Sequence, residues 1–361
     1  MRALIDIGHP AHVHYFRHLA KKITDNGGSV LFTLREKEMT LTLVKAYGLD
    51  YYSFGKAKRS IAGKIFAQFS ITFKLLVAAL RYKPDVVLNS THYSAFVSWL
   101  IRKPHISIED TFNMEQVRLY TPFTNVIITG DYPHPSMPRQ LLVDAFQESL
   151  YLRSEYFTPD PQVIRSLGVE PGEKFSVVRF VSWTASHDMG LSGMSSENRV
   201  RAVEEFSSYG KVFITSEVEL PRALEKFRVK IPVDKIHHLL YYASLVFSEG
   251  ATMVTEAALL GTPSVYLSSK GIYDSRYLAE RYGIVFNLEE EEAIEKGCEI
   301  LKESSNINDK RVREEIEKDT ADYTSILYEV VKHAVNNGRR RTTPLSLLKA
   351  MPEKFRKNVR I

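Results

Sequence analysis

Four of the eleven histidines of this 361-residue chain lie within ten residues, at His9, His12, His14 and His18. They follow a strand-like run, Ala3–Ile7, which places His9 and His12 in the turn or the first helical turn after that strand. Imidazole titrates near neutral pH, so such a side chain could remove a proton from a substrate hydroxyl. Two other interpretations stay open. The histidines could cap or cover the helix, or His14 and His18 could bind a metal, although no nearby carboxylate completes such a site.

A second chemical signal is the turn Ser248-Glu-Gly-Ala-Thr-Met253, which lies between a strand-like run and a helix-like one. Gly250 and Ala251 would let a ligand approach the backbone closely, and Thr252 is a plausible N-cap. The N-terminus of the helix would present free N–H groups and a partial positive charge, which suit a diphosphate. Glu256, one turn later, could accept two hydroxyl hydrogen bonds, as from a ribose. Alternatively, Glu256 only complements the helix dipole and the small residues only permit tight packing.

Several other predicted strands are followed by polar side chains that could contact a ligand or take part in catalysis. In the first half of the chain these are His92, Glu109 and Asp110. In the second half they are Arg179, Ser182 and Ser216, and His237 is a further candidate that opens a predicted helix. Ligands of doubly wound sheets bind outside the carboxyl ends of the strands, where these residues are expected. Capping, loop hydrogen bonding or burial of a bonded histidine explains each of them equally well when it is taken alone.

The predicted strands and helices that must position these residues alternate regularly along the chain. Short β-branched runs alternate with longer amphipathic runs in both halves of the chain, which is typical of βαβ units around a parallel sheet. Six prolines between residues 131 and 172 interrupt the rhythm and predict a domain boundary near 155–172. We therefore predict an α/β protein with two doubly wound, Rossmann-like parallel-sheet domains that face a cleft. The first domain covers 1–160 and the second 172–333, and a basic tail follows over 334–361.

The positive charge of the chain is concentrated in two regions. The net charge is +5, and residues 331–361 hold nine Lys or Arg and one Glu. Residues 56–83 hold seven Lys or Arg and no acid, within a largely apolar run. A solvated basic surface is one interpretation, and attraction to an anionic membrane or lipid carrier is the other. Nucleic acid is not an expected partner, because the basic regions lack helix-turn-helix, zinc-finger and RRM signatures.

Other features of the composition predict a cytoplasmic protein with, at most, peripheral contact at the inner membrane face. The N-terminus begins with a strand-like run rather than the pattern of a secretory signal. No run of 18 uninterrupted apolar residues occurs. The single cysteine, Cys298, cannot form an internal disulfide and fits a reducing compartment. The oligomeric state cannot be predicted.

The turn after Ser248 resembles the C-terminal signature of GT-B enzymes, a two-domain family that acts on sugar nucleotides. It is similar to the run Ser-Gly-Gly/Ala-x-Thr-x-x-Glu-x-x-x-x-Gly-x-Pro of the N-acetylglucosaminyltransferases that form lipid II, and to the matching run of hydrolysing UDP-N-acetylglucosamine 2-epimerases. This resemblance implies that the loop from Ser248 to Met253 lies on the nucleotide of a UDP-sugar. Within it, Gly250, Ala251 and Thr252 would bind the diphosphate, and Glu256 would bind the ribose. Glu249 stands where these families usually have Gly or Ser.

The first half carries matching resemblances. Ala11-His12-Val13 is similar to the Gly-His-Val of the first loop in the same transferases, which implies that His12 is the base, with His9 as the alternative. The loops that contain His92 and Glu109-Asp110 resemble acceptor-side loops, and this implies acceptor-binding or base roles. Together, Gly-His-Pro-Ala-His-Val-His, Ser-Trp-x-Ala-x-His-Asp-x-Gly and Ser-Glu-Gly-Ala-Thr-Met resemble the domain-of-unknown-function family 354 over most of residues 1–330.

These resemblances predict a metal-independent glycosyltransferase that moves a sugar from a UDP-sugar to a glycan or polyprenyl-linked acceptor, with no cofactor. Helix N–H groups and the Arg179 region would stabilise the leaving diphosphate. A UDP-N-acetylsugar 2-epimerase is the first alternative, since that reaction needs only the nucleotide site and several carboxylates. A non-catalytic protein that binds nucleotide sugars is the second.

Overall fold

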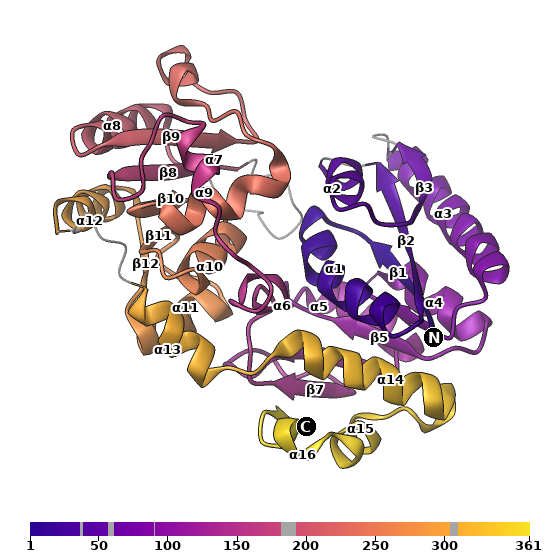
Figure 1. Ribbon diagram of the computed structural model, residues 1–361. Helices are drawn as coiled ribbons and strands as arrows, with labels where there is room; N and C mark the ends of the chain where they lie inside the picture. Colours follow the sequence, from indigo (N-terminus) through magenta and orange to yellow (C-terminus); the bar gives the residue numbers. More distant parts are fainter. Residues whose placement is uncertain (37–38, 57–60, 90, 182–192, 304–309) are drawn as a thin grey trace. The chain divides into compact units, whose positions relative to one another are not determined.

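The computed structural model describes the chain except residues 37–38, 57–60, 90, 182–192 and 304–309. The chain forms two compact units. Unit 1 comprises Met1–Tyr151 and Thr320–Ile361, and unit 2 comprises Leu152–Asp319. Figure 1 shows a strand-and-helix layer structure in each unit. Among the described residues, no helix combines the length and the apolar character needed to cross a lipid bilayer.

Unit 1 is built around an eight-stranded sheet with the order β13-β7-β6-β5-β4-β1-β2-β3. Its strands are β1 (Arg2–Ile7), β2 (Ser29–Glu36), β3 (Tyr51–Lys56), β4 (Val86–Leu88), β5 (His105–Ile108), β6 (Val126–Gly130), β7 (Gln140–Val143) and β13 (Val359–Arg360). The strands from β1 to β7 pair in parallel, and β13 pairs antiparallel to β7. The middle of β1, Ala3–Ile5, is fully buried, as expected for a strand covered on both faces.

The helices of unit 1 join these strands and cover the sheet (Figure 1). They are α1 (Pro10–Asp25), α2 (Thr40–Ala46), α3 (Ile61–Tyr82), α4 (His92–Leu100), α5 (Met114–Tyr120), α6 (Ser149–Leu152), α14 (Tyr323–Arg341), α15 (Pro344–Ala350) and α16 (Glu353–Arg356). The chain runs from β1 outward to β3, crosses back through α3, and continues from β4 in the opposite direction. The strand order therefore reverses between β1 and β4, and sheets of this kind bind ligands beyond the carboxyl ends of the strands at such a point.

Unit 2 has a five-stranded, all-parallel sheet with the order β12-β11-β10-β8-β9. Its strands are β8 (Phe175–Phe180), β9 (Lys211–Ser216), β10 (Leu245–Ser248), β11 (Ser264–Leu267) and β12 (Val285–Leu288). Its helices are α7 (Pro161–Arg165), α8 (Ser196–Ser207), α9 (Ile236–Tyr242), α10 (Ala251–Leu259), α11 (Tyr273–Tyr282), α12 (Glu290–Glu303) and α13 (Arg311–Asp319). The order reverses between β8 and β10, so the predicted turn after Ser248 lies at the reversal point. The expected pair of parallel-sheet α/β domains is thus confirmed.

The domain boundaries differ from the prediction. The chain leaves unit 1 after Tyr151, and the segment from Thr320 onward belongs to unit 1 rather than to a separate tail. Four of the six prolines of 131–172 do not mark this boundary, because three lie before residue 139 in the connection between β6 and β7, and Pro161 begins α7 within unit 2. A proline suits a tight connection or the first turn of a helix as well as it suits a linker.

The C-terminal segment is held in unit 1 by partly buried polar contacts. Arg339 donates to the carbonyl oxygens of Phe123 and Lys103, at 2.7 and 3.1 Å. Asn125 in turn donates to the carbonyl oxygen of Arg339 at 2.6 Å. Burial lowers the pKa of the Arg339 guanidinium. Arg339, a basic residue of the predicted tail, thus holds the C-terminal segment on unit 1. The number of charged residues in the tail could not predict this contact.

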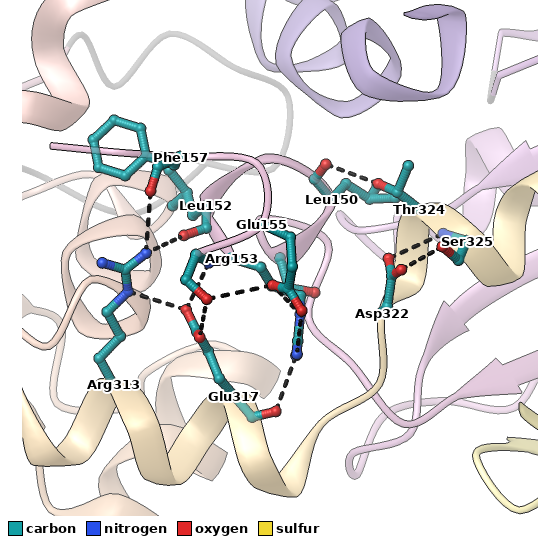
Figure 2. Close-up of polar contacts among 12 residues, drawn as sticks. Leu150, Leu152, Arg153, Glu155, Phe157, Arg313, Glu317, Asp322, Thr324 and Ser325 are labelled. Carbon is teal, nitrogen blue, oxygen red and sulfur yellow. Dashed lines mark hydrogen bonds and ion pairs between the residues drawn. The ribbon is translucent and has the colours of Figure 1, made fainter. Parts of the chain in front are cut away.

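The chain passes between the units twice, after Tyr151 and after Asp319. Polar contacts within unit 2 hold the residues next to both of these passages (Figure 2). Arg313 of α13 donates to the carbonyl oxygens of Leu152 and Phe157, at 3.0 and 3.4 Å, and to Glu317 at 3.0 Å. Glu317 accepts from the backbone N–H and the hydroxyl of Ser154, at 2.9 and 2.7 Å. The first residues of unit 2 are therefore tied to its last helix.

The stability of unit 1 depends on pH in the acidic range through His105 of β5. The ring is fully buried, with Nε2 3.1 Å from Ser94 Oγ and Nδ1 3.0 Å from Thr124 Oγ1. Burial, reinforced by the charge of Arg339, lowers the pKa of His105 to about 3, because the charged ring loses its hydration.

We expect the stability from His105 to be fully present above about pH 6.5 and to be lost as the pH falls from there toward about 3. In that window the unfolded chain binds a proton that the folded chain does not. Thermal unfolding midpoints measured across this range should fall less steeply for His105→Gln than for the parent chain. Part of the slope should remain, because burial lowers the pKa of His12 and His18 in the same direction. Parallel slopes would contradict the assignment.

Candidate functional site

Three loops of unit 1 carry polar side chains beyond the carboxyl ends of β1, β4 and β5. Asp6, the next-to-last residue of β1, is buried and accepts hydrogen bonds from Thr33 at 2.8 Å and Thr91 at 2.5 Å. Thr91 also caps α4 through the N–H of Ser94. Burial raises the pKa of Asp6, and the two threonines oppose that rise. Asp6 therefore joins the loop after β4 to β1 and β2.

His12 lies at the centre of this arrangement. Its Nδ1 is 2.7 Å from Asn89 Nδ2 and accepts the backbone N–H of Gly8 at 3.3 Å. Burial, opposed in part by the charge of Asp110, lowers the pKa of His12 to about 4. The structure thus brings His12 together with Asn89, which follows β4. Asn89 has a positive φ of 102°, a conformation that asparagine tolerates better than most residues.

The other histidines of the first loop have separate contacts. His9 is the N-cap of α1, and its Nδ1 accepts the N–H of Ala11 at 3.3 Å. His14 Nδ1 is 3.1 Å from the hydroxyl of Tyr47. His18 Nε2 accepts from Arg17 at 3.0 Å. His9 therefore has the capping role that was one of the open interpretations, while its ring lies 6.1 Å from that of His12.

Tyr15 connects His12 to Asp110, the residue that follows Glu109 after β5. The rings of His12 and Tyr15 are 5.8 Å apart, and the Tyr15 hydroxyl donates to Asp110 Oδ2 at 2.7 Å. Burial and the charges of Asp110 and Glu148 raise the pKa of Tyr15, so this hydroxyl keeps its proton. Asp110 is only partly buried.

Glu109 does not fit its predicted role as a base. Its Oε1 accepts from Thr111 N, Thr111 Oγ1 and Phe112 N, at 3.2, 2.8 and 3.0 Å, and its Oε2 accepts from Tyr120. The side chain is buried, and this burial raises its pKa. The Glu109 carboxylate therefore accepts four hydrogen bonds that hold the turn after β5. It has little capacity left to accept a further hydrogen bond or a proton from a substrate. Sequence spacing could not reveal this, because Tyr120 reaches Glu109 only in the folded chain.

His92 lies farther along the loop after β4, at the first residue of α4. Its Nε2 is 2.6 Å from Gln68 Oε1 of α3, and its ring is 3.9 Å from that of Tyr93. Burial, with the charge of Arg35, lowers the pKa of His92. Among the described residues, no contact joins His92 to the group formed by His12, Tyr15 and Asp110.

In unit 2 the predicted turn has the expected form with one shift. Gly250, rather than Thr252, is the N-cap of α10, and no side chain caps the helix. Ser248, buried at the end of β10, bonds through its hydroxyl to Gly250 N at 2.9 Å and Gly250 O at 2.8 Å. A Cβ atom at position 250 would lie 3.0 Å from Val181 Cγ1, so only glycine fits comfortably. The first turn of α10 contains no acid and leaves its N–H groups available to an anion.

Glu256 and His237 lie together in unit 2. His237 Nε2 is 2.9 Å from Glu256 Oε1, and both side chains are buried. Glu256 comes from the second turn of α10 and His237 from α9. Two residues that the sequence nominated separately therefore form one polar pair beside the uncapped end of α10.

Glu249 has contacts different from those expected of a ligand-binding residue. The buried carboxylate accepts from Val181 N at 2.9 Å, Met194 N at 2.8 Å and the Arg199 guanidinium at 3.0 Å. It thus links β10 to the residues that flank 182–192. The sequence analysis had included Glu249 among the substrate-binding residues, but its oxygen atoms accept hydrogen bonds from within the protein.

The remaining candidates after β8 and β9 are less closely grouped. Arg179 forms an ion pair with Glu217. Ser216 bonds through its hydroxyl to both the N–H and the carbonyl of Val218, which closes a short turn. Ser182 lies outside the described residues. Arg179 and Ser216 remain near the carboxyl edge of the sheet, but their contacts are those of loop residues.

Sequence reasoning missed Asn89, Thr91 and Tyr15 as members of the unit 1 group. Asn89 and Thr91 carried a usable signal, because they follow a strand directly and lie in the same loop as His92. Tyr15 carried none, because an aromatic residue at a helical spacing is most often part of the core. Its hydroxyl meets Asp110, 95 residues farther along the chain, only in the folded protein.

Comparison with known proteins agrees with this architecture. A protein of Methanocaldococcus jannaschii described as uncharacterized is 23% identical over 275 residues, which covers 72% of this chain and 80% of that protein. The UDP-N-acetylglucosamine 2-epimerase of Neisseria meningitidis, solved with UDP-N-acetylglucosamine, has a TM-score of 0.61 at 13% identity and covers 92% of this chain and 100% of that one.

The glycosyltransferase VinC, solved with dTDP, has a TM-score of 0.57 at 15% identity and covers 94% of this chain and 100% of that chain. These two enzymes share the fold of this protein, and their low identity shows the fold alone. Residues 1–130 match the family described as a protein of unknown function, DUF354.

Proposed function

We propose that the protein is a GT-B-type enzyme that binds a UDP-sugar on unit 2 and transfers the sugar to a glycan or lipid-linked acceptor. The observation that carries the proposal is the uncapped N-terminus of α10 at the strand-order reversal of unit 2, beside the Glu256–His237 pair. The N–H groups of α10 would hold the diphosphate and stabilise it as it leaves. Glu256 would accept hydrogen bonds from the ribose hydroxyls.

Unit 1 would supply the acceptor side. The loops after β1, β4 and β5 gather a histidine, an amide and a carboxylate at the strand-order reversal of that sheet. Groups of this kind can orient a hydroxyl and remove its proton. The resemblance of the first loop to those of glycosyltransferases supports the same assignment. No metal is required by the proposal, because helix N–H groups take the charge of the leaving group.

A 2-epimerase is a second candidate, favoured by the similarity in fold to an enzyme solved with UDP-N-acetylglucosamine. Such an enzyme would need no separate acceptor. Incubation of the full chain with UDP-N-acetylglucosamine alone separates the two. An epimerised or cleaved product formed without acceptor would support the epimerase and would count against the transferase.

The nucleotide site itself is tested by thermal-shift and calorimetric titration of the full chain with UDP, dTDP and a panel of UDP-sugars. A stabilisation of the folded chain that is specific to uridine nucleotides is expected. No shift with any of them would overturn the central claim. Binding without turnover across a broad acceptor panel would instead favour a protein that only binds nucleotide sugars.

Peripheral membrane contact belongs to the same proposal, and helix α3 supports it. Phe69, Phe73 and Leu80 are 74, 67 and 58% exposed. At 100° per residue they lie within about 40° on one side of the helix, opposite the buried Leu75. Residues 56–83 contain seven Lys or Arg and no acid. An exposed aromatic stripe within a basic segment suits the interface of an anionic bilayer.

We expect Phe69→Ser combined with Phe73→Ser to weaken binding to vesicles at least about tenfold, because two aromatic rings would lose their burial in the interface. The measurement is co-sedimentation with phosphatidylcholine vesicles, with and without phosphatidylglycerol. Leu119→Ser is the matched control, since Leu119 is 60% exposed but belongs to α5, outside both basic regions. Binding of the parent chain should require the anionic lipid and fall with salt. Equal binding of parent and double variant would contradict the assignment of α3.

A further inference from the structure

The hydrogen bonds around His12 determine which of its nitrogens carries the proton. The backbone N–H of Gly8 can only donate, so Nδ1 must accept. Asn89 Nδ2 also faces Nδ1, and the same amide nitrogen is 2.6 Å from the carbonyl oxygen of Asp6. Rotating the amide by 180° would set its oxygen against that carbonyl oxygen, so the amide orientation is fixed. Nδ1 therefore receives two N–H groups, and the proton of the neutral ring is on Nε2.

A histidine fixed in this way can donate a hydrogen bond from Nε2 but cannot accept a proton there. Nε2 has no partner among the described residues of the chain and is the nitrogen available to a ligand. The lowered pKa, about 4, keeps the ring neutral at physiological pH. This is the reverse of the role that the resemblance to glycosyltransferases implied for His12.

The carboxylates of the same group differ in their remaining capacity to accept a proton. Asp6 bonds to a threonine through each of its oxygens, and Glu109 accepts from four donors. Asp110 accepts one hydrogen bond, from Tyr15 to Oδ2, and its Oδ1 receives none from the described residues. Asp110 is also partly exposed, whereas Asp6 and Glu109 are buried.

We propose that Asp110 is the general base of unit 1, which takes the proton of the acceptor substrate. His12 is a fixed hydrogen-bond donor, and it positions the acceptor substrate by donating from Nε2 to one of its oxygen atoms. This rests on the proposed transferase function. The O–H bond of the acceptor hydroxyl breaks and its proton passes to Asp110 Oδ1. The oxygen forms a bond to the anomeric carbon, and the bond from that carbon to the diphosphate breaks, with its electron pair going to the diphosphate oxygen. Tyr15 holds the Asp110 carboxylate through Oδ2.

The tautomer can be measured without substrate, so this part of the test is independent of the proposed function. The full chain is labelled with ¹⁵N-histidine, and the His12 signals are assigned by comparison with His12→Gln. Long-range ¹H–¹⁵N correlations should show Nδ1 unprotonated and Nε2 protonated between about pH 8 and pH 5. Asn89→Asp replaces an N–H donor beside Nδ1 by a carboxylate, so it should raise the pKa of His12 above that of the parent chain. A parent His12 with its proton on Nδ1, or one that becomes charged near pH 6.5, would overturn the proposal.

Turnover with a UDP-sugar and an acceptor tests the division of roles. We expect Asp110→Asn to lower kcat about 10²- to 10⁴-fold with little change in KM, as for loss of a general base. His12→Gln, which keeps an N–H donor, should mainly raise the KM of the acceptor. The opposite pattern, with kcat lost in His12→Gln and retained in Asp110→Asn, would sink the assignment. If no acceptor is ever glycosylated, the transferase proposal fails, and the NMR result still decides the tautomer.

Discussion

Replacing Glu249 by alanine is expected to lower the free energy of unfolding of unit 2 by about 3–5 kcal/mol, the usual cost of breaking a buried ion pair from one side. The Glu249 side chain is completely buried, and Arg199 beside it is 13% exposed. The variant would leave that guanidinium without its counter-charge. It would also leave the N–H groups of Val181 and Met194 without the acceptors they have now, at 2.9 and 2.8 Å.

Urea unfolding followed by circular dichroism and tryptophan fluorescence measures this loss, and the two units require a fit that allows more than one transition. Glu249→Gln is the matched control, because it keeps the shape and one acceptor oxygen while it removes the charge. Its loss should be smaller than that of Glu249→Ala. A loss below about 1 kcal/mol in the alanine variant would show that Glu249 is not the link between β10 and the residues that flank 182–192.

The Glu249 contacts illustrate what could be predicted from the sequence and what could not. The βα rhythm correctly predicted two parallel sheets, because each strand and helix is encoded by local patterns of apolar residues. The same reasoning placed the turn after Ser248 at the carboxyl end of a strand, where the structure has it. It could not show that Glu249 points toward Arg199 of α8, because that contact joins elements about 50 residues apart in the chain.

The boundary between units was harder to predict for a related reason. The segment from Thr320 returns to unit 1, where Thr324 donates to the carbonyl oxygen of Leu150 at 2.9 Å (Figure 2). Asp322 caps α14 through the N–H of Ser325, so this helix starts at a local signal that the sequence does contain. The sequence contains no signal for which of the two sheets this helix covers, because the apolar face of an amphipathic helix can pack on either sheet.

The unit 1 site shows the same limit at the level of single atoms. A histidine one turn after a strand was a reasonable candidate base, and the structure does place His12 with Asn89 and near Asp110. The direction of proton transfer, however, depends on which ring nitrogen faces the Gly8 N–H. That detail is set by the backbone of the loop, and resemblance between motifs carries no information about it.

The second large effect is expected in nucleotide binding. Glu256→Ala should raise the Kd for UDP about 100-fold, because two hydroxyl hydrogen bonds to a carboxylate would be lost and each is worth about 1.5 kcal/mol or more. Isothermal titration calorimetry with UDP measures this. UMP serves as a ligand that keeps the ribose but lacks the diphosphate, and uracil as one that lacks both. Uracil binding should be affected least.

A control is needed because Glu256 is itself buried and bonded to His237 at 2.9 Å. Glu256→Gln keeps the volume and an acceptor oxygen, so it should fold like the parent chain and lose less affinity. His237→Gln removes the ring but leaves the carboxylate, and it tests whether His237 only orients Glu256. If Glu256→Ala stays folded and binds UDP as tightly as the parent chain, the ribose is not held by Glu256. Nucleotide binding would then depend on the uncapped end of α10 alone. A helix N-terminus binds the phosphates but makes no contact with the ribose, so it would discriminate poorly between a nucleotide and any other diphosphate.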